Sequence, residues 1–203
     1  MIKILKANEK AIKEAAEIVE KGELIIYPTD TVYGLGCNPK DVDAISKVFT
    51  AKGRGKKPLP VLVSNIKIVE RIAYMNEMAE ILASEFWPGP LTMILELKEK
   101  FPEKLTCGLK TIGVRIPGRE FTIKLIDECG GLLVGTSANK SGAKPPRTVW
   151  EAVNQVGDYV KLAIDGGFAK TSKPSTIVDL TKKRVKLIRE GPIKFYKILT
   201  TLE

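Results

Sequence analysis

The sequence contains no histidine. This absence removes the commonest general base and the commonest zinc ligand of enzymes. A Ser-His catalytic arrangement is therefore impossible. Any catalysis has to use lysine, arginine, hydroxyl groups, carboxylates, backbone amides or the substrates themselves. The three cysteines (Cys37, Cys107 and Cys129) are widely spaced and form no CxxC pair, so we expect neither disulfides nor a structural zinc site.

Long apolar runs are also missing. No run approaches the roughly 20 residues that a membrane-spanning helix needs. The N-terminal segment has no secretory h-region, so we expect a cytoplasmic protein. The hydrophobic fraction of 44% is ordinary for a chain that buries a core. With 203 residues and no low-complexity linker or internal repeat, we expect one domain over residues 1–203.

Positive charge is in excess, with 33 lysines and arginines against 24 acidic residues and a net charge of +9. Such an excess favours anionic partners, either phosphates or nucleic acid. A lysine-rich solvated surface explains it equally well. A module that binds double-stranded RNA or tRNA is therefore an alternative to an enzyme. Against it, aromatics make up 6% of the chain, and no aromatic run or GXXG loop typical of RNA-binding folds is present.

Hydrophobic periodicity alternates between helical and strand patterns, which predicts a single-domain α/β fold with a twisted mixed β-sheet flanked by helices. Asn8 and Asp41 are expected to cap helices. The segments TDTVYGLGC and TSANKSGAKPPRT are expected to be loops. Helices are predicted over about 9–21, 42–51, 67–73, 76–86, 119–129 and 148–156. Strands are predicted over 24–27, 58–64, 91–97, 112–116, 132–135, 161–164, 175–180 and 184–189.

Polar and cationic segments follow several predicted strands and helices, where open α/β sheets place ligands. Tyr27–Gly36 brings hydroxyls and glycines after a buried strand, which suits close backbone approach to a small ligand or simply a polar turn. Four cations occur among the six residues of Lys52–Lys57. The helix dipole explains one or two of them. The others suit phosphate, although RNA-binding loops have the same composition.

Two further segments carry unusual polar residues. Arg115 lies in an apolar strand, so it is either paired with a carboxylate or directed at a ligand anion. Ser137 and Asn139 are two residues apart at a strand end, and they point to the same side if the chain stays extended there. Taken alone, the segments 174–180 and 187–192 predict two strands and a turn.

Taken in order along the chain, these segments resemble the YrdC family of threonylcarbamoyl-AMP synthases. The resemblance runs from about Asn8 to Pro192. Its most specific parts are PTDTVYGLG, the K-x-R and S-x-N signatures, and the closing STIVDL and IREGP. The order of five such pieces is stronger evidence than any one of them.

The resemblance implies a nucleotidyltransferase that combines ATP, L-threonine and bicarbonate into L-threonylcarbamoyladenylate and releases pyrophosphate. A separate threonylcarbamoyl transferase complex then modifies adenosine 37 of tRNA. Mg²⁺ is expected to be held mainly through ATP phosphates, with no side chain as a metal ligand. The chain resembles the single-domain members, without the C-terminal second domain that longer members carry.

The resemblance also implies site residues. Catalytic roles fall on Lys52 and Arg54. Threonine contacts fall on Thr31, Arg115, Ser137 and Ser175. Nucleotide contacts fall on Lys52, Arg54, Thr111, Asn139, Arg147 and Arg189.

The chain departs from the family pattern at two of these places. The loop after Arg54 is one residue shorter than in many members, which leaves a nucleotide role for Lys57 open. The segment KPPRT around Arg147 stands where many members have SPT. A carbamoyl-transfer module like the related domain of hydrogenase maturation proteins is a further alternative, which the length of the chain disfavours.

Overall fold

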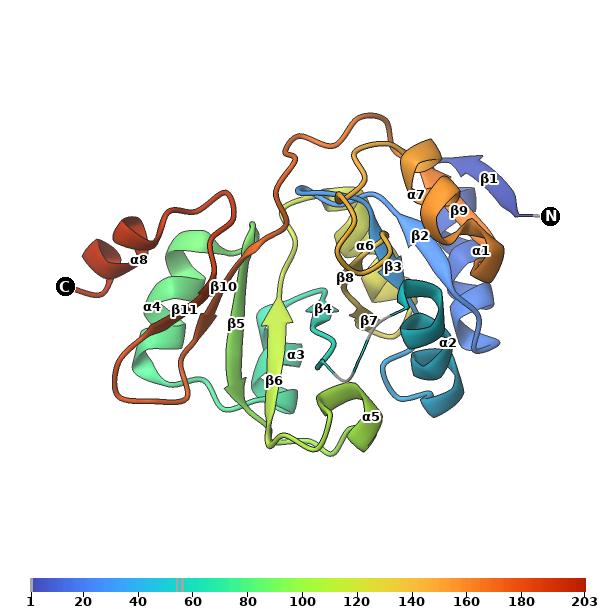
Figure 1. Ribbon diagram of the computed structural model, residues 1–203. Coiled ribbons are helices and arrows are strands. Elements are labelled where there is room, and N and C mark those ends of the chain that lie inside the picture. Colours follow the sequence, from blue (N-terminus) through green and yellow to red (C-terminus); the bar gives the residue numbers. More distant parts are fainter. Residues whose placement is uncertain (1, 54, 56) are drawn as a thin grey trace.

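The strands form two mixed sheets (Figure 1). A computed structural model describes residues 2–53, 55 and 57–203. One sheet has five strands in the order β1 (Lys3–Lys6), β9 (Leu162–Asp165), β2 (Ile25–Tyr27), β3 (Gly34–Gly36) and β8 (Thr136–Ser137). The other has six in the order β11 (Lys186–Arg189), β10 (Thr176–Asp179), β5 (Leu91–Glu96), β6 (Thr111–Arg115), β4 (Val61–Val63) and β7 (Leu132–Val134). The predicted α/β class with mixed β-structure flanked by helices is confirmed, and the strands are divided between these two sheets.

Both sheets combine parallel and antiparallel neighbours. In the five-stranded sheet, β9 pairs in parallel with β1 and β2, whereas β3 pairs antiparallel with β2 and β8. In the six-stranded sheet, β10 is parallel to β5 and β6 is parallel to β4, and the remaining pairs are antiparallel. Parallel pairs need crossover connections, which the helices between strands supply.

Most of the helices begin after a residue whose side chain accepts a hydrogen bond from the first turn. The helices are α1 (Glu9–Glu20), α2 (Val42–Lys52), α3 (Ile66–Ile72), α4 (Glu77–Phe86), α5 (Glu103–Thr106), α6 (Glu120–Glu128), α7 (Val149–Val156) and α8 (Phe195–Thr201), with a 3₁₀ turn at Gly157–Tyr159. As predicted, the Asn8 and Asp41 side chains accept hydrogen bonds from the first turns of α1 and α2. No helix in the described ranges is long and apolar enough to cross a membrane.

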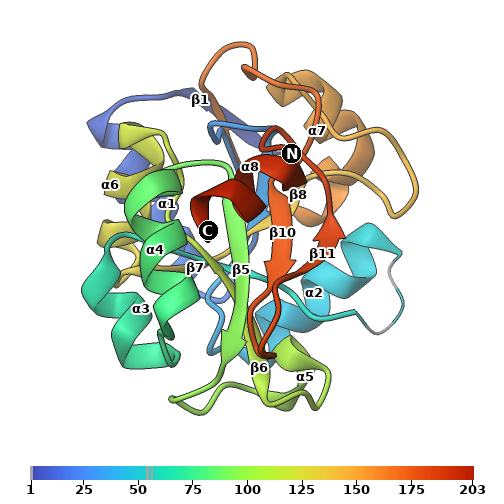
Figure 2. The ribbon, with the colours of Figure 1, turned by 90° about the vertical axis from the view of Figure 1, so that its left-hand side faces the viewer.

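The alternation of side chains along β2 builds the core on both faces of the five-stranded sheet. Ile25 and Tyr27 pack in a cluster with buried residues of α1 and α6. Leu24 and Ile26 belong to the larger cluster, which includes the buried residues of α7. In Figure 2 helix α8 lies in front of the six-stranded sheet, and α4, which contacts α8, lies beside it.

The chain passes from one sheet to the other at Gly135. This residue lies between β7 and β8, and its amide donates to the Pro60 carbonyl at 2.9 Å. A Cβ atom here would lie 2.5 Å from Cγ of Leu62, so a side chain would not fit. β7 and β8 are edge strands, so this one-residue connection places an edge of the six-stranded sheet next to an edge of the five-stranded sheet.

Several elements differ from the sequence-based expectation. β3 and β8 form where loops were predicted, and β1, α5 and α8 were not predicted at all. β3 was missed because glycine is a poor strand former on intrinsic propensity. β8 has two residues, which is too short for periodicity to reveal.

Candidate active site

A cavity of about 500 Å³ lies between the two sheets. Its walls come from β2, β3 and β8 on one side and from β10 and β11 on the other, with the C-terminal end of α2 and several connecting segments. Six residues that the sequence predicts for the site line it together: Thr31, Lys52, Ser137, Asn139, Ser175 and Arg189. These residues are far apart in the chain, so the cavity is a product of the tertiary fold.

The charged groups that line the cavity are cationic. They are Lys52, Lys57 and Arg189, and the described lining includes no aspartate or glutamate. Arg54, predicted as a catalytic and nucleotide-binding residue, lies outside the described residues. A low-dielectric space with several cations and several hydroxyls favours a ligand that has both anionic and polar groups.

Lys52 joins the end of α2 to the segment after β8. Its ammonium donates to the Ser137 carbonyl and, at 2.8 Å, to the Asn139 carbonyl. The Ser141 amide returns a hydrogen bond to the Lys52 carbonyl at 2.8 Å. We call these residues, Lys52, Ser137, Asn139 and Ser141, the Lys52 cluster. Gly53 ends α2 in the left-handed conformation (φ 54°), which directs the cationic segment out of the helix.

Asn139 stabilises the conformation of the segment that follows β8. Its Nδ2 donates to the carbonyls of Lys140 (2.8 Å) and Ala143 (2.9 Å). Its amide donates to the Ser137 carbonyl at 2.9 Å, so the chain turns here and is not extended. Ser137 and Asn139 nevertheless both line the cavity. Among the described residues, the buried Oδ1 of Asn139 has no partner, and it is an acceptor that a ligand could use.

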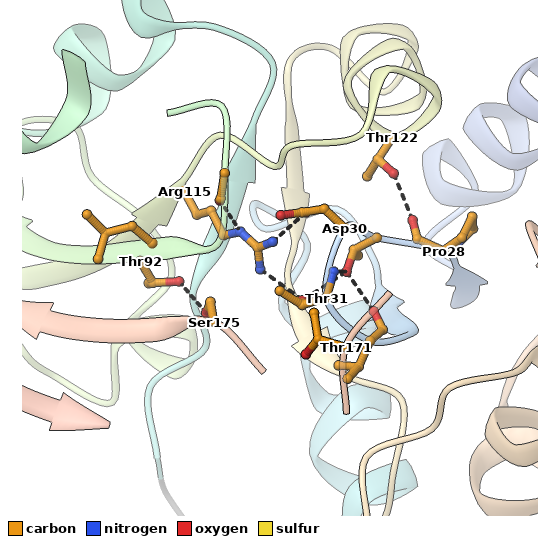
Figure 3. Close-up of polar contacts among 12 residues, drawn as sticks. Pro28, Asp30, Thr31, Thr92, Arg115, Thr122, Thr171 and Ser175 are labelled. Carbon is orange, nitrogen blue, oxygen red and sulfur yellow. Dashed lines mark hydrogen bonds and ion pairs between the residues drawn. The ribbon is translucent and has the colours of Figure 1, made fainter. Parts of the chain in front are cut away.

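Arg115 makes a second set of contacts, shown in Figure 3. Its guanidinium donates to the Asp30 carboxylate, to the Thr31 hydroxyl at 3.3 Å and to the Gly89 carbonyl at 2.9 Å. We call Arg115, Asp30, Thr31 and Gly89 the Arg115 cluster. Both charged side chains are buried, with exposed fractions of 5% and 8%. Of the two roles left open by the sequence, the pairing with a carboxylate is therefore present.

Ser175 is held between two neighbours. Its hydroxyl lies 2.8 Å from that of Thr92 on β5, as Figure 3 shows. Arg189 donates from Nε and Nη2 to the Ser175 carbonyl at 3.0 and 2.8 Å, and from Nη2 to the Ser175 hydroxyl at 3.3 Å. The antiparallel pairing of β10 and β11 brings Arg189 opposite Ile177, next to this serine. A predicted threonine contact and a predicted nucleotide contact thus lie side by side.

Two predicted nucleotide contacts lie outside the cavity as the described residues define it. Thr111 is at the opposite end of β6 from Arg115. The guanidinium of Arg147 lies 4.1 Å from the centre of the Phe168 ring and donates to the Ala169 carbonyl at 3.2 Å. Arg147 lines a separate cavity of about 380 Å³ with Lys170, Lys173 and Lys194. The nucleotide roles of Thr111 and Arg147 stay predictions.

The glycines of β3 accommodate a tyrosine. Gly34 and Gly36 pair with Tyr27 and Ile25, and a Cβ atom on either glycine would lie 2.7 Å from a Tyr27 ring carbon. The Tyr27 hydroxyl donates to the Val134 carbonyl at 2.9 Å, and burial raises its pKa above the ordinary tyrosine value. These glycines are therefore needed because the Tyr27 ring packs closely against them. Gly34 also lines the cavity.

Sequence reasoning missed three polar residues of the site. Thr29 lines the cavity, while Asp30 and Thr92 contact predicted site residues. Lys57, whose role the sequence left open, also lines the cavity. Thr29 and Asp30 belong to the PTDT part of the motif. Their position next to Thr31, a predicted site residue, could have indicated that they lie at the site. Thr92 gives no such signal, because a threonine in a half-buried strand is ordinary.

Comparison with known proteins gives consistent matches. The sequence model of the Sua5/YciO/YrdC family, described as telomere recombination, matches residues 17–191. A threonylcarbamoyl-AMP synthase of Pyrococcus abyssi is 37% identical over 193 residues, which are 94% of this chain and 57% of that protein. A putative threonylcarbamoyl-AMP synthase of Methanocaldococcus jannaschii is 37% identical over 207 residues, which are 98% of this chain and 96% of that protein.

A solved structure matches over the whole chain. The crystal structure of P. abyssi Sua5 complexed with L-threonine superposes with a TM-score of 0.94 at 35% identity, covering 100% of this chain and 61% of that one. The chain therefore spans somewhat more than half of the P. abyssi relative and nearly all of the M. jannaschii relative.

Proposed function

The chain belongs to the Sua5/YciO/YrdC family, and from that premise we propose that it is an L-threonylcarbamoyladenylate synthase. The reaction joins L-threonine, bicarbonate and ATP, and releases pyrophosphate and water. One observation carries the proposal: a single cavity is lined by Lys52, Lys57 and Arg189 together with the hydroxyls and the amide of Thr31, Ser137, Ser175 and Asn139. Its cations suit a triphosphate, and its hydroxyls suit a small polar amino acid.

The chemistry does not need a strong protein base. The threonine amine adds to the carbon of CO₂ or activated bicarbonate and loses a proton, which gives a carbamate. A carbamate oxygen then forms a bond to the α-phosphorus of ATP, and the bond to pyrophosphate breaks. Such transfers are accelerated mainly by positioning and by fixed positive charge. Lys52 is the described residue best placed for that role, and we propose Arg54 beside it.

The same cations act on the amine. A positive charge close to an ammonium group lowers its pKa, because it disfavours the protonated form. We therefore propose that the cations of the cavity help to keep the bound threonine amine neutral and nucleophilic. Mg²⁺ would be held by ATP oxygens, because the described lining offers hydroxyl and carbonyl oxygens and no carboxylate.

Arg115 keeps capacity for the threonine carboxylate although it is paired. A guanidinium has five N–H groups, and the contacts to Asp30, Thr31 and Gly89 use three of them. Arg115 is not among the described residues that line the cavity, and we propose that its two remaining N–H groups take a ligand oxygen at the Thr31 end of the cavity. Selectivity for threonine would come from a partner for its hydroxyl, so that valine is rejected strongly and serine only modestly.

The decisive experiment is incubation of the protein with labelled L-threonine, bicarbonate, ATP and Mg²⁺. We expect pyrophosphate and threonylcarbamoyl adenylate in equal amounts, and neither product when bicarbonate is left out. Valine in place of threonine serves as the matched control and should give almost no product. Folded protein that yields neither product in the complete mixture would overturn the proposal.

RNA binding is a second candidate, which the net charge of +9 favours. A weak interaction with tRNA would also suit the proposed cytoplasmic location and the downstream transferase complex that consumes the product. Titration of tRNA at increasing salt separates the candidates. An RNA-binding module loses affinity steeply with salt and releases no pyrophosphate, whereas the synthase turns over without RNA.

A further inference from the structure

Two threonine hydroxyls lie next to one another in the segment between β2 and β3. Oγ1 of Thr29 and Oγ1 of Thr31 are 3.0 Å apart. Both residues are buried, and both line the cavity. The distance alone does not say which hydroxyl donates its proton and which accepts it. Their other hydrogen bonds decide this question.

Thr29 has already used its proton. Its hydroxyl donates to the Val32 carbonyl at 2.6 Å, and a carbonyl oxygen can only accept. Because a hydroxyl carries one proton, Thr29 has none left for Thr31. The Thr29 oxygen also accepts from the Thr31 amide at 3.1 Å. In the contact between the two hydroxyls, Thr31 is therefore the donor and Thr29 the acceptor.

The Thr31 hydroxyl is thus fixed in direction. Its proton points to Thr29, and its oxygen accepts from Nη1 of Arg115 at 3.3 Å (Figure 3). A hydroxyl oxygen has two lone pairs, so one lone pair of Thr31 remains. Toward the cavity, Thr31 can accept a hydrogen bond but cannot donate one. A carboxylate or phosphate oxygen of a ligand therefore finds no hydrogen bond at this place.

We propose that Thr29 is a positioning residue that holds the Thr31 hydroxyl as an acceptor, so that the ligand places an N–H or O–H group against Thr31. This inference rests on the proposed function and deepens it, because L-threonine has two such groups, the amine and the side-chain hydroxyl. It also implies that the threonine carboxylate is bound elsewhere in the cavity. Thr29 acts through Thr31 and does not itself need to contact the reacting atoms.

The test compares Thr29→Val with Thr29→Ser. Valine has nearly the shape of threonine but neither donates nor accepts, so the Thr31 proton loses its partner and can turn toward the cavity. Serine keeps the hydroxyl and should restore the wild-type behaviour. The matched control is Thr122→Val, which removes another fully buried hydroxyl that donates to a carbonyl, that of Pro28 at 2.7 Å. Thr29→Cys, whose thiol is a weak acceptor, replaces Thr29→Val if the latter does not fold.

Binding of L-threonine is measured by calorimetry in the absence of ATP. We expect about tenfold weaker binding for Thr29→Val, the size of one lost hydrogen bond to a ligand, and unchanged binding for Thr29→Ser and Thr122→Val. Unchanged binding for Thr29→Val, or equal weakening for Thr122→Val, overturns the inference. The KM for ATP should stay the same in all these variants.

Two analogues identify the group that faces Thr31. L-2-Aminobutyrate lacks the side-chain hydroxyl, and (3R)-3-hydroxybutyrate lacks the amine. The weakening by Thr29→Val should disappear for one of them, the analogue that lacks the facing donor. Weakening that persists with both analogues overturns the inference while leaving the proposed function intact. Wild-type protein that binds no threonine and makes no adenylate overturns the proposed function, and this inference with it.

Discussion

The Arg115 cluster and the Lys52 cluster differ in the groups that their cations contact. In the Arg115 cluster the guanidinium is paired with the buried carboxylate of Asp30, so the pair is formally neutral. In the Lys52 cluster the ammonium donates to the carbonyls of Ser137 and Asn139, which are dipoles and not charges. Both cations are buried, with exposed fractions of 4% each.

This difference predicts that the two clusters contribute unequally to folding stability and to the proposed catalysis. A buried ion pair is costly to break, because removing one partner leaves the other charge buried and unpaired. A cation in a cavity whose described lining has no carboxylate contributes most to the field that a phosphate ligand meets. We therefore expect the Arg115 cluster to matter more for folding and the Lys52 cluster to matter more for turnover.

The largest effect should come from Arg115→Met. It leaves Asp30 buried without its cation and should lower the free energy of unfolding by about 3–5 kcal/mol. Urea denaturation followed by circular dichroism measures this change. The double variant Arg115→Met with Asp30→Asn should recover part of the loss, because no unpaired charge then remains. Arg115→Met that is as stable as the wild type would remove the basis of the comparison.

Lys52→Met should affect turnover more than stability. We expect kcat/KM to fall about a hundredfold, the usual loss when one group that stabilises transition-state charge is removed. The pKa of the bound amine should rise when the cation is removed, so the pH–rate profile should move to higher pH. Steady-state pyrophosphate release between pH 6 and 10 measures both effects.

Lys124→Met is the control for this variant, because Lys124 is an exposed lysine on α6 away from the cavity lining. It should leave the rate and the pH profile unchanged. If Lys52→Met kept the wild-type rate and pH profile, the proposed action of the cation on the amine would be wrong.

Asn139→Ala tests the support of the Lys52 cluster. The change removes the hydrogen bonds to the carbonyls of Lys140 and Ala143, and with them the shape of the segment that carries Ser137. We expect the KM for ATP to rise roughly tenfold, equivalent to about 1.4 kcal/mol. Asn65→Ala, which removes a side chain that caps α3 and does not line the cavity, is the matched control. Equal KM values for both variants would contradict the assigned support.

The smallest effect should come from the surface pair Lys6–Asp165, with atoms 2.5 Å apart. Lys6→Met should cost less than about 1 kcal/mol, because solvent screens an exposed pair. The Lys6 hydrogen bond lowers the pKa of Asp165, so the stabilisation is present above the unfolded value of about 4 and is lost as the pH falls through the folded value. Melting temperatures of variant and wild type should therefore differ at pH 7 and converge near pH 3. If Lys6→Met lost as much free energy of unfolding as Arg115→Met, burial would not determine how much an ion pair contributes to stability.

Local features of the fold were predictable from the sequence. Asn8 and Asp41 cap helices through amides two or three residues away, so their role depends on neighbours in the chain. The apolar positions of α1 recur at helical spacing and therefore mark its buried face. The strands β3 and β8 were not predictable in this way, because two of the three residues of β3 are glycines and because β8 pairs with a distant segment, β3.

The site shows the same division. Thr31, Lys52, Ser137, Asn139, Ser175 and Arg189 were predicted by resemblance to a family, and the structure places them around one cavity. Their individual roles stay predictions. The pairing of Arg115 with Asp30 was left open, since the two residues are 85 positions apart and no local pattern links them.

By itself, the sequence determined the α/β class, the helix caps, the cationic segment after α2 and the exclusion of histidine chemistry, because each depends on composition or on neighbours within a few residues. The tertiary structure decided that the strands form two sheets, that the glycines of β3 receive the Tyr27 ring, that Arg115 meets a carboxylate, and that the Thr31 hydroxyl faces the cavity as an acceptor. The two sheets and the Arg115 contacts depend on distant segments, which only the packing of the whole chain brings together. The Thr31 orientation combines neighbours within three residues with Arg115, which is 84 positions away.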